Sequence, residues 1–567
     1  MLSARWTVKP QVSSSEVLSP LRVGDASEIA WAQQTDVLVV GFGAAGAAAA
    51  LQARESGREV LVVDRFEGGG ASQLSGGVVY AGGGTRQQRE AGINDSPEAM
   101  FEYLKQETAG VVSDATLLRF CRDSVANLEW LEKHGARFAS TTPKQKTSYP
   151  PDGVFLYYSG NETVPAMAGQ HPPAMRGHRT VSAGQSGATL YGALKKATRA
   201  SGATVQMQSV VRRLVVDASG RVIGAEVWQI PPGSQAAVRH KAAHREANAC
   251  YPFNPNRAES LRRETLEIEL AHARPILVRA HHGVVLASGG FMFNREMLQA
   301  HAPRYLSNWR NGSTGCDGSG IRLGLSAGGR GAHMNRVSAW RFISPPYAWP
   351  KGIAVNARGE RFCNEEVYGS TLGNEIIEHQ NGRAWLILDA RLRWQAIREC
   401  FGKELWGFQK WPALAGMLLG VTRAFTPERL ARKLGMEPAA LRAAITANNR
   451  AARGECDDVV GKSPTMRREL TRGPWYALDL SPAFKFFPLS SITLGGLVVS
   501  EDTGEVLTGN GQAIRGLYAV GRCATGIPSN MYISGLSLAD CVFSGRRAAR
   551  HAALEISDKV ASKELTP

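Results

Sequence analysis

Apolar runs separated by a helical stretch give the first structural signal of the chain. Residues 36–40 and 59–64 are almost wholly apolar runs of strand length, and Gly41 ends the first of them. Between them, residues 44–56 have an alanine-rich, helical composition, and Gly57 is placed to end the helix. Strand, helix and strand within about thirty residues predict a βαβ unit, whose crossover should be right-handed.

Further predicted helices and strands follow, together with one long loop region and one insertion. Residues 140–182 hold several prolines, glycines and aromatic residues, which is typical of an ordered loop region. Residues 231–275 are polar, with one helical stretch near 259–271, and they interrupt an expected hairpin, so we interpret them as an insertion. Helices are expected at 97–109, 114–134 (capped by Asp114), 191–201 and 535–553, and strands at 204–216, 222–228, 282–290 and 516–521.

A change of character near residue 336 predicts a second domain. From there to residue 487 the chain is rich in tryptophan and mixes helical with strand patterns. Helices are expected in this stretch near 374–379, 390–402, 427–434 and 438–450. The predicted organisation is an irregular leader (1–34), an α/β domain in two parts (35–335 and 488–567) and an inserted α+β domain (336–487).

Composition and charge exclude several classes of protein. With 43% apolar residues, 12 Trp, 13 Tyr and 18 Phe in 567 residues, the chain is not disordered. Residues 37–51, the longest uncharged apolar run, are too few to cross a bilayer, and the eight cysteines form no CxxC pair. The formal charge of +16 contains no run of five like charges and no nucleic-acid-binding motif. No signal-peptide pattern opens the chain, so reduced thiols in the cytoplasm are expected.

Gly41, Gly43 and Gly46 match the dinucleotide-binding pattern GxGxxG. The motif follows a predicted strand, opens a predicted helix and lies about 20 residues before Asp64, at the end of the next strand. Gly41 permits the tight turn, Gly43 lets the backbone approach a pyrophosphate, and Gly46 lets helix and strand pack closely. The helix N-terminus offers N–H groups to the phosphates, and Asp64 would accept hydrogen bonds from ribose hydroxyls. An adenine dinucleotide is therefore predicted.

A second glycine-rich loop, at 68–77, follows Asp64 directly, where a nicotinamide enzyme would need none. With this loop the chain resembles the flavoprotein superfamily of fumarate reductase and succinate dehydrogenase, from about residue 35 to 555 and apart from the insertion. The matching stretches are GFGAAG (41–46), the GGxSxxSGG-like loop (69–77), LASGGF (286–291), GCDGSG (315–320), GERFCNEE (359–366), TLGGL (493–497) and GLYAVGRCATG (516–526). The resemblance implies FAD and an α/β fold in which a Rossmann-like FAD-binding domain carries an inserted α+β catalytic, or capping, domain.

The resemblance also implies which residues contact FAD. Ser72, Gly76 and Gly77 approach the flavin, Val211 lies where the backbone pairs with adenine, and residues 535–538 open the last helix, facing flavin O2. A helix N-terminus there would stabilise negative charge as the flavin is reduced. The implied cofactor-binding set is Gly41, Gly43, Ala44, Ala45, Gly46, Asp64, Arg65, Ala71, Ser72, Ser75, Gly76, Gly77, Val211, Ala287, Ser288, Gly289, Asp317, Gly521, Gly535, Ser537 and Leu538.

Three positions depart from the fumarate reductases. Members that act on dicarboxylates carry arginines that align with Gly369 and Tyr532, and a histidine pair where this chain has Ser491 and Ile492. A dianion needs bidentate arginine donors or their equivalent, which tyrosine and isoleucine do not replace. Fumarate and succinate are therefore not expected as substrates.

Tyr532, Ser534 and Tyr368 stand near these positions. With them, the chain looks like the 3-ketosteroid dehydrogenases of the same superfamily, closest to the Δ4-(5α) branch. The resemblance implies FAD-dependent desaturation of a 3-oxo-5α-steroid to a 3-oxo-Δ4-steroid, in steroid degradation, with a hydride passing from C5 to flavin N5. Ser534 would take the C4 proton and pass it toward Tyr532 and Tyr368, because a serine alone is a poor base.

Other interpretations of the same residues stay open. A 3-ketosteroid Δ1-dehydrogenase or a fumarate-reductase-like enoate reductase would keep the flavin and change the reaction. A flavin-binding protein without turnover would not need the hydroxyl groups of Tyr532, Ser534 and Tyr368. Two further tyrosines, Tyr157 and Tyr158, follow Tyr149 in the loop region, where packing is favoured over a role in the site.

The expected partners are a steroid substrate and an external electron acceptor. No metal is expected, because the 12 histidines show no metal-ligand spacing, and no nucleic acid is expected. The insertion at 231–275 either helps the protein to attach peripherally to a membrane or is a solvated loop with no task. The oligomeric state stays open.

Overall fold

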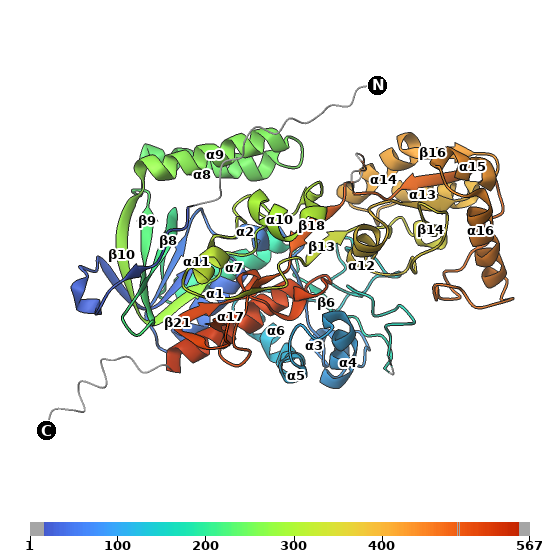
Figure 1. Cartoon of the computed structure of the whole chain (residues 1–567). Coiled ribbons are helices and arrows are strands. Elements are labelled where there is room, and N and C mark those ends of the chain that lie inside the picture. Colours follow the sequence, from blue (N-terminus) through green and yellow to red (C-terminus); the bar gives the residue numbers. More distant parts are fainter. Residues whose placement is uncertain (1–15, 170, 483, 485, 487, 555–567) are drawn as a thin grey trace.

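The computed structural model describes residues 16–554 except 170, 483, 485 and 487, and it divides into a large α/β part and a smaller cap. In Figure 1 the blue, green and red segments build the α/β part, and the orange segments build most of the cap. Helix α17 (Leu536–Leu554), near the end of the chain, packs along α1 (Ala44–Glu55), near its start. The α/β fold class with an inserted cap is therefore confirmed.

A nine-stranded sheet forms the centre of the α/β part. Strands β2, β3 and β7 run parallel, and β8, β9 and β10 form an antiparallel meander whose last strand also pairs in parallel with β2. The predicted βαβ unit is confirmed as β2, α1 and β3, with Val37 opposite Val60. The strands are β1 (Leu21–Arg22), β2 (Gln33–Val40), β3 (Val60–Asp64), β7 (Thr204–Met207), β8 (Ser209–Val216), β9 (Val222–Gln229), β10 (Arg274–Leu286), β20 (Glu505–Leu507) and β21 (Ala513–Ala519).

Small residues let α1, α17 and the sheet approach one another closely. The first ten residues of α1 are buried, and seven of them are alanines. A Cβ atom at Gly545 of α17 would lie 2.7 Å from the carbonyl oxygen of Ala45 and 3.1 Å from Ala48 Cβ. Because interiors are close-packed, a larger residue there would push α17 away from α1.

Smaller sheets and helices surround this core and connect it to the cap. Three sheets are ordered β4-β6-β5, β11-β18-β13 and β12-β19. Their strands are β4 (Val78–Tyr80), β5 (Leu156–Tyr157), β6 (Gly177–Arg179), β11 (Trp309–Arg310), β12 (Gly331–Ala332), β13 (Val337–Trp340), β18 (Ser490–Thr493) and β19 (Gly496–Leu497). The helices are α2 (Gly70–Gln73), α3 (Arg86–Glu90), α4 (Pro97–Thr108), α5 (Asp114–Arg122), α6 (Ser124–Lys133), α7 (Gly187–Ala200), α10 (Arg295–His301) and α11 (Ser319–Ser326).

The cap has an antiparallel sheet and a hydrophobic core of its own. Its strands follow the order β14 (Ile353–Asn356), β15 (Ala384–Leu388), β17 (Trp475–Asp479) and β16 (Val421–Ala424). Its helices are α12 (Gly369–Asn374), α13 (Ala390–Cys400), α14 (Gly407–Leu419), α15 (Pro427–Leu434) and α16 (Pro438–Ala452). The helices expected near 390–402, 427–434 and 438–450 are confirmed, and the stretch at 375–379 continues α12 as a π-helical turn.

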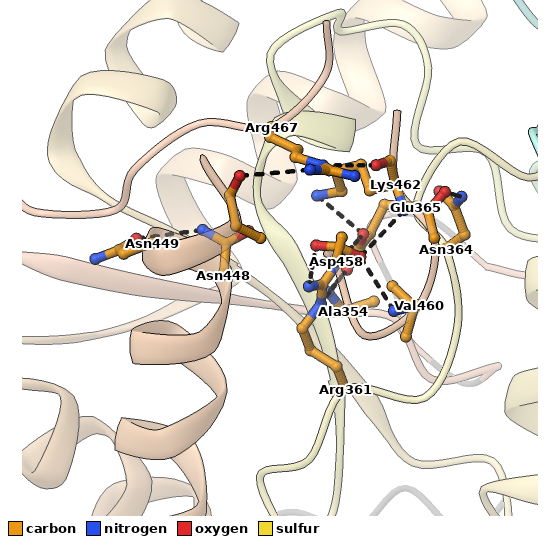
Figure 2. A network of polar contacts seen from close by, with 12 residues as sticks. Ala354, Arg361, Asn364, Glu365, Asn448, Asn449, Asp458, Val460, Lys462 and Arg467 are labelled. Carbon is orange, nitrogen blue, oxygen red and sulfur yellow. Dashed lines mark hydrogen bonds and ion pairs between the residues drawn. The ribbon is translucent and has the colours of Figure 1, made fainter. Parts of the chain in front are cut away.

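A buried network of ion pairs anchors the segment that leads to Tyr368 (Figure 2). Glu365 contacts Arg361 at 2.8 Å and Lys462 at 2.9 Å, and Arg361 also contacts Asp458 at 2.7 Å. Two cations face two anions, and the side chains are at most 2% exposed, so the charges compensate one another without water. Removing one partner would leave a buried charge unpaired, so the network fixes this segment against β14.

The insertion at 231–275 is more ordered than the sequence predicts. It forms two helices, α8 (Gln235–Cys250) and α9 (Pro255–His272), which pack on each other. Together they connect the antiparallel strands β9 and β10, which pair with each other. The interrupted hairpin and the helical stretch near 259–271 are therefore confirmed, and the structure adds a second helix, α8. Both helices start with a side-chain cap, at Ser234 and Asn254, that the mixed polar composition concealed.

Three other local expectations need correction. The leader is irregular only in part: β1 pairs in parallel with β8, while residues 1–15 lie outside the described residues. The helix expected at 114–134 is α5 followed by α6, and the side chain of Ser113 caps it in place of Asp114. The strand expected at 204–216 breaks at Gln208, whose φ of 54° takes the backbone out of the extended region.

Candidate active site

A cavity lies at the carboxyl ends of β2 and β3, against the start of α1, where the sequence predicts the dinucleotide. The structure brings most of the predicted cofactor-binding residues together in its wall. These are Gly41, Gly43, Ala44, Ala45, Asp64, Arg65, Ala71, Ser72, Val211, Ala287, Ser288 and Gly289. Ligands bind at this edge of parallel sheets, so the cavity has the position that the motif requires.

The three glycines of the motif differ in what surrounds them. A Cβ atom on Gly41 would lie 2.7 Å from the carbonyl group of Ala287, and one on Gly46 would lie 1.9 Å from the Gly41 oxygen. Both positions are therefore closed by protein backbone. A Cβ on Gly43 would meet nothing nearer than Ser72 Oγ, at 3.5 Å. Gly43 faces the cavity, which fits a glycine reserved for the close approach of a pyrophosphate.

Asp64 holds the glycine-rich loops in place. Its carboxylate accepts hydrogen bonds from the backbone N–H groups of Phe42 at 2.8 Å, Phe66 at 2.8 Å and Gly68 at 3.1 Å. A carboxylate offers about four acceptor positions, so one remains for a ribose hydroxyl. The predicted ribose contact stays a prediction, and the structure adds a loop-positioning role.

Arg65 and Asp317 form an ion pair at the cavity wall. The Arg65 guanidinium contacts Asp317 at 2.8 Å and Glu269 of α9 at 2.7 Å. Asp317 lies behind Arg65 and is not part of the cavity wall. Asp317 and Glu269 therefore fix the orientation of the Arg65 guanidinium. Asp317 would act on the cofactor only indirectly, by positioning Arg65.

The insertion supplies residues of this wall that the sequence did not indicate. His244 of α8 lines the cavity and stacks on Phe66, with ring centroids 3.6 Å apart. Burial lowers the pKa of His244 to about 3, so its ring is neutral at physiological pH. His240 of the same helix contacts Glu269 at 2.9 Å. The sequence held one indication that the insertion could reach the cavity: it joins two strands of the sheet that carries the cofactor site.

The remaining predicted cofactor residues, Gly46, Ser75, Gly76, Gly77, Gly521, Gly535, Ser537 and Leu538, lie outside this wall. Several are close-packing positions: a Cβ on Gly76 would lie 2.6 Å from the Tyr149 ring, and one on Gly535 would lie 2.7 Å from the Tyr80 nitrogen. Their contacts with a flavin ring stay predictions.

A cluster of hydroxyl groups gathers around Ser534, immediately before α17. Ser534 Oγ lies 3.0 Å from the hydroxyl oxygen of Tyr157, which belongs to β5 and is fully buried. Tyr368, at the start of α12, lies close enough to Ser534 for that side chain to act on the pKa of its hydroxyl group. Burial raises the pKa of Tyr157 and Tyr368 well above the usual value, so both hydroxyl groups stay protonated. Tyr157 packs with Val78 and Tyr149, as expected, and its contact with Ser534 is an addition to that packing.

Tyr532 is near this cluster but is oriented differently. Its ring packs edge-on against Trp340, with centroids 4.9 Å apart, and its backbone oxygen accepts a hydrogen bond from Ser370. Burial raises the pKa of its hydroxyl group, against an opposing hydrogen bond with the backbone at Gly535. Ser534 therefore has Tyr157 and Tyr368 as its tyrosine neighbours here.

A second cavity, of about 230 Å³, lies where the loop region meets the cap. Tyr368 is part of its wall, which links the cavity to the hydroxyl cluster around Ser534. The other wall residues are mixed: about half are polar or charged, among them Lys146, Glu365 and Glu366, and the apolar and aromatic ones include Phe342, Ile343, Tyr347, Pro350, Val367 and Met466. Tyr158 also lines this cavity, whereas Tyr149 packs against Gly76 and Gly184, as expected for loop packing. Such a wall offers an apolar ligand a surface to pack on together with polar groups that can orient it.

Two buried polar residues beside this cluster, Glu162 and Asn161, were not indicated by the sequence. Glu162 is 1% exposed, and in the described part of the chain its Oε1 has no hydrogen-bond partner. Burial raises the pKa of Glu162, against the opposing charge of Lys146. Asn161, next to it, accepts a hydrogen bond from the Tyr368 N–H at 2.6 Å and donates to Glu107 at 2.8 Å. This amide fixes the backbone of Tyr368.

The position aligned with a substrate-binding arginine of fumarate reductases has no room for a side chain. A Cβ atom on Gly369 would lie 2.6 Å from the ring of Phe342, which lines the second cavity. Ser491, in place of a histidine, accepts a hydrogen bond from Asn308 at 2.8 Å and is buried. Neither position offers the bidentate cation that a dicarboxylate requires.

Comparison with known proteins agrees with this geometry. The pattern of the FAD binding domain family matches residues 36–535. The 3-oxo-5-alpha-steroid 4-dehydrogenase of Comamonas testosteroni is 48% identical over 528 residues, which cover 91% of this chain and 97% of that protein. The 3-oxosteroid 1-dehydrogenase of Mycobacterium tuberculosis is 26% identical and covers 92% of this chain and 98% of that protein. The crystal structure of the 3-ketosteroid-delta4-(5alpha)-dehydrogenase from Rhodococcus jostii RHA1, in complex with 4-androstene-3,17-dione, superposes with a TM-score of 0.80 at 29% identity, covering 95% of this chain and 100% of that one.

Gly43→Asp tests the cofactor cavity. We expect a folded protein without FAD, because an aspartate suits the first position of a helix while its carboxylate would face the phosphates. Flavin absorbance of the purified protein measures occupancy, and circular dichroism measures folding. Gly43→Ala is the matched control and should fold, because its Cβ atom meets no atom closer than 3.5 Å. A folded Gly43→Asp protein with wild-type flavin content would contradict the assignment.

His244→Ala tests whether the insertion serves the cofactor. We expect FAD to bind about tenfold more weakly, because an aromatic contact in the cavity wall is lost. Titration of the apoprotein with FAD, followed by quenching of flavin fluorescence, gives the dissociation constant. His272→Ala, an exposed histidine on the same hairpin, is the control and should leave the affinity unchanged. Equal affinities of the wild type, His244→Ala and His272→Ala for FAD would contradict this role and favour a solvated hairpin with no task.

Proposed function

This chain belongs to the FAD binding domain family, and we propose that it is an FAD-dependent 3-oxo-5α-steroid 4-dehydrogenase. The observation that carries the proposal is the buried hydroxyl cluster of Ser534, Tyr157 and Tyr368, because Tyr368 also lines the second cavity. The reaction removes a proton from C4 and a hydride from C5 of a 3-ketosteroid. The high identity to a 3-oxo-5-alpha-steroid 4-dehydrogenase over nearly its whole length supports this substrate class.

The residues described above fit FAD. The motif glycines and the start of α1 would hold its pyrophosphate, Asp64 would hold a ribose, and Val211 and His244 lie in the wall of the same cavity. FAD, when bound, supplies the acceptor for the hydride that leaves C5. The protein's own task is to place C4 of the steroid at Ser534 and to keep water away from the second cavity.

Ser534 takes the C4 proton with help from its neighbours. A serine hydroxyl is a poor base alone, so its own proton must leave as the C4 proton arrives. Tyr157 contacts Ser534 and Tyr368 lies close to it, and each can receive a proton at its oxygen while releasing its own. Because their pKa values are raised, they conduct the proton rather than store it. Glu162, whose charge acts on both tyrosines, is the nearby carboxyl group able to receive it.

The role of Tyr532 in this scheme is revised. The resemblance implied that it receives the proton from Ser534, whereas Tyr157 occupies the hydrogen-bond distance to Ser534 Oγ. Tyr532 is packed on Trp340 next to the start of α17. We assign it to polarisation of the 3-keto oxygen, which acidifies the C4 hydrogens.

The rival functions differ in product or in substrate. A Δ1-dehydrogenase would remove hydrogens from C1 and C2, and an enoate reductase would bind a carboxylate. The crowded Gly369 position disfavours the carboxylate. An external electron acceptor must reoxidise the flavin after each turnover. All eight cysteines are unpaired, which supports the reducing cytoplasm as the compartment.

The proton relay is tested by removing its hydroxyl groups. Ser534→Ala should slow flavin reduction by about 100- to 10,000-fold, the usual contribution of general acid–base catalysis. Tyr157→Phe and Tyr368→Phe should each cost less than the double variant, because either tyrosine can accept the proton. Stopped-flow reduction with substrate deuterated at C4 should show a primary isotope effect where proton removal limits the rate.

Tyr158→Phe is the control for these variants. It lines the same cavity, and its hydroxyl group contacts the Pro173 oxygen at 3.4 Å rather than Ser534, so reduction should keep nearly its wild-type rate. Near wild-type reduction in Ser534→Ala and in the double tyrosine variant would move the base elsewhere.

The substrate class is tested by anaerobic mixing of the yellow protein with steroids. We expect 5α-androstane-3,17-dione to bleach the flavin and to yield the 4-ene-3-ketone, identified by mass spectrometry and NMR. A 1-ene product would favour the Δ1-dehydrogenase. Persistent colour with this compound and with saturated bile-acid-like ketones would overturn the steroid assignment.

A further inference from the structure

Large apolar side chains are exposed on two helices of the cap and line neither cavity. Trp394 on α13 is 60% exposed, Trp411 on α14 is 65% exposed and Leu419, at the end of α14, is 74% exposed. We name this the α13–α14 surface. It consists of Trp394, Phe401, Phe408, Trp411, Leu418 and Leu419. In Figure 1 the two helices lie together in the orange part of the molecule, at the opposite end from α8 and α9.

The exposed residues follow the helical period on one face of each helix. On α14 they occur at 408, 411 and 418, with partly exposed Ala415 between them, while Ala413, Leu414 and Met417 face the cap core. Residues three and four apart share a helix face, so Phe408, Trp411 and Leu418 form one stripe. An apolar stripe on both faces of a helix is not explained by the fold of a single chain.

Basic side chains surround the apolar ones. Lys410 Nζ lies 5.6 Å from the ring centroid of Trp411 and 5.9 Å from that of Phe401, and Arg391 and Arg398 are exposed on the same face of α13 as Trp394. Between residues 390 and 425 there are six lysines and arginines against two glutamates. One of these, Glu399, accepts hydrogen bonds from Ala348 and Gln395. The surface is therefore positively charged.

We propose that the α13–α14 surface docks on an anionic phospholipid membrane. Tryptophan and phenylalanine with lysine and arginine are the side chains that enter the interfacial region of bilayers, where rings reach the acyl boundary and cations reach lipid phosphates. A second copy of this chain is a poor occupant, because a symmetric contact would oppose two patches of the same positive charge. In the described residues no helix is both long and apolar enough to traverse a bilayer, so attachment is peripheral.

The helical hairpin of the insertion is a weaker candidate for the same contact. Phe253, in its turn, is 90% exposed, but the neighbouring charges occur in ion pairs such as Arg239 with Glu264 and Arg257 with Glu246. Its inner side contributes His244 to the cofactor cavity. The excess of positive charge beside exposed rings is found at the α13–α14 surface.

The surface adjoins the second cavity. Trp406 Nε1, at the start of α14, donates to the Pro150 oxygen at 2.9 Å, and Gln409 donates to Ser148 Oγ at 3.3 Å. Ser148 is part of the cavity wall. If the proposed steroid function holds, a substrate dissolved in the membrane would reach the cavity along this side of the cap, and that one step rests on the function.

Vesicle binding tests the proposal with the intact protein. We expect cosedimentation with vesicles of phosphatidylcholine and phosphatidylglycerol, weaker binding to phosphatidylcholine alone, and release as salt increases. Trp411→Ser with Leu418→Ser should weaken binding about tenfold or more, and Lys403→Glu with Lys410→Glu should abolish the preference for the anionic vesicles. Phe253→Ser is the control on the hairpin and should bind like the wild type.

Each other outcome overturns the proposal. Absence of binding, or equal binding to neutral and anionic vesicles, removes the anionic membrane as the occupant. Loss of binding in Phe253→Ser alone moves the contact to the hairpin. A dimer in light scattering that Trp411→Ser with Leu418→Ser dissociates, without vesicle binding, identifies a second copy. Flavin reduction by dissolved steroid should stay unchanged in Trp411→Ser with Leu418→Ser. Flavin reduction therefore tests the steroid function, and vesicle cosedimentation tests the membrane contact, independently of each other.

Discussion

The site depends on glycine at a few positions around the start of α1, where the packing leaves no room for a side chain. A Cβ atom at Gly41, Gly46 or Gly545 would overlap the backbone of β10, of the motif turn or of α1. These contacts hold β2, α1 and α17 at distances that larger residues do not permit. They leave Gly43 facing the cofactor cavity, and they place the segment before α17 beside β4 and β5. Cofactor cavity and hydroxyl cluster therefore follow from one packing arrangement.

The hydroxyl cluster is assembled from three distant parts of the chain, and each is fixed separately. Ser534 is tied by its N–H group to the Ser159 oxygen, at 3.0 Å, close to Tyr157 in the sequence. Tyr368 follows the segment that Arg361 and Glu365 anchor in the cap, and Asn161 holds its N–H group. Glu365 of that network also lines the second cavity, but Arg361 and Lys462 compensate its charge, whereas the groups that would act on the steroid are neutral hydroxyl groups.

The sequence predicted what depends on local pattern. The βαβ unit, the glycine motif and the last helix are each determined by residues that lie close together in the sequence. Helix α14 was not predicted because Gly407, Pro412 and Gly416 interrupt its pattern, and tertiary contacts with the cap core offset that cost. Tyr157 was taken for a packing residue because it lies in a proline-rich stretch, where no period indicates which way a side chain points. Its distance to Ser534 depends on a sheet of three short strands far from α17 in sequence.

The replacement of cations by rings and hydroxyl groups explains why the same fold would change its substrate class. An arginine buried beside Phe342 would be costly unless a carboxylate neutralised it. Gly369 has no space for one, and burial keeps Tyr157 and Tyr368 protonated. The position aligned with the carboxylate-binding arginine therefore offers no cation, which fits a neutral ligand such as a ketosteroid. The chemistry left to such a wall is the transfer of a proton between hydroxyl groups, and it requires a carbon acid that a neighbouring ketone activates.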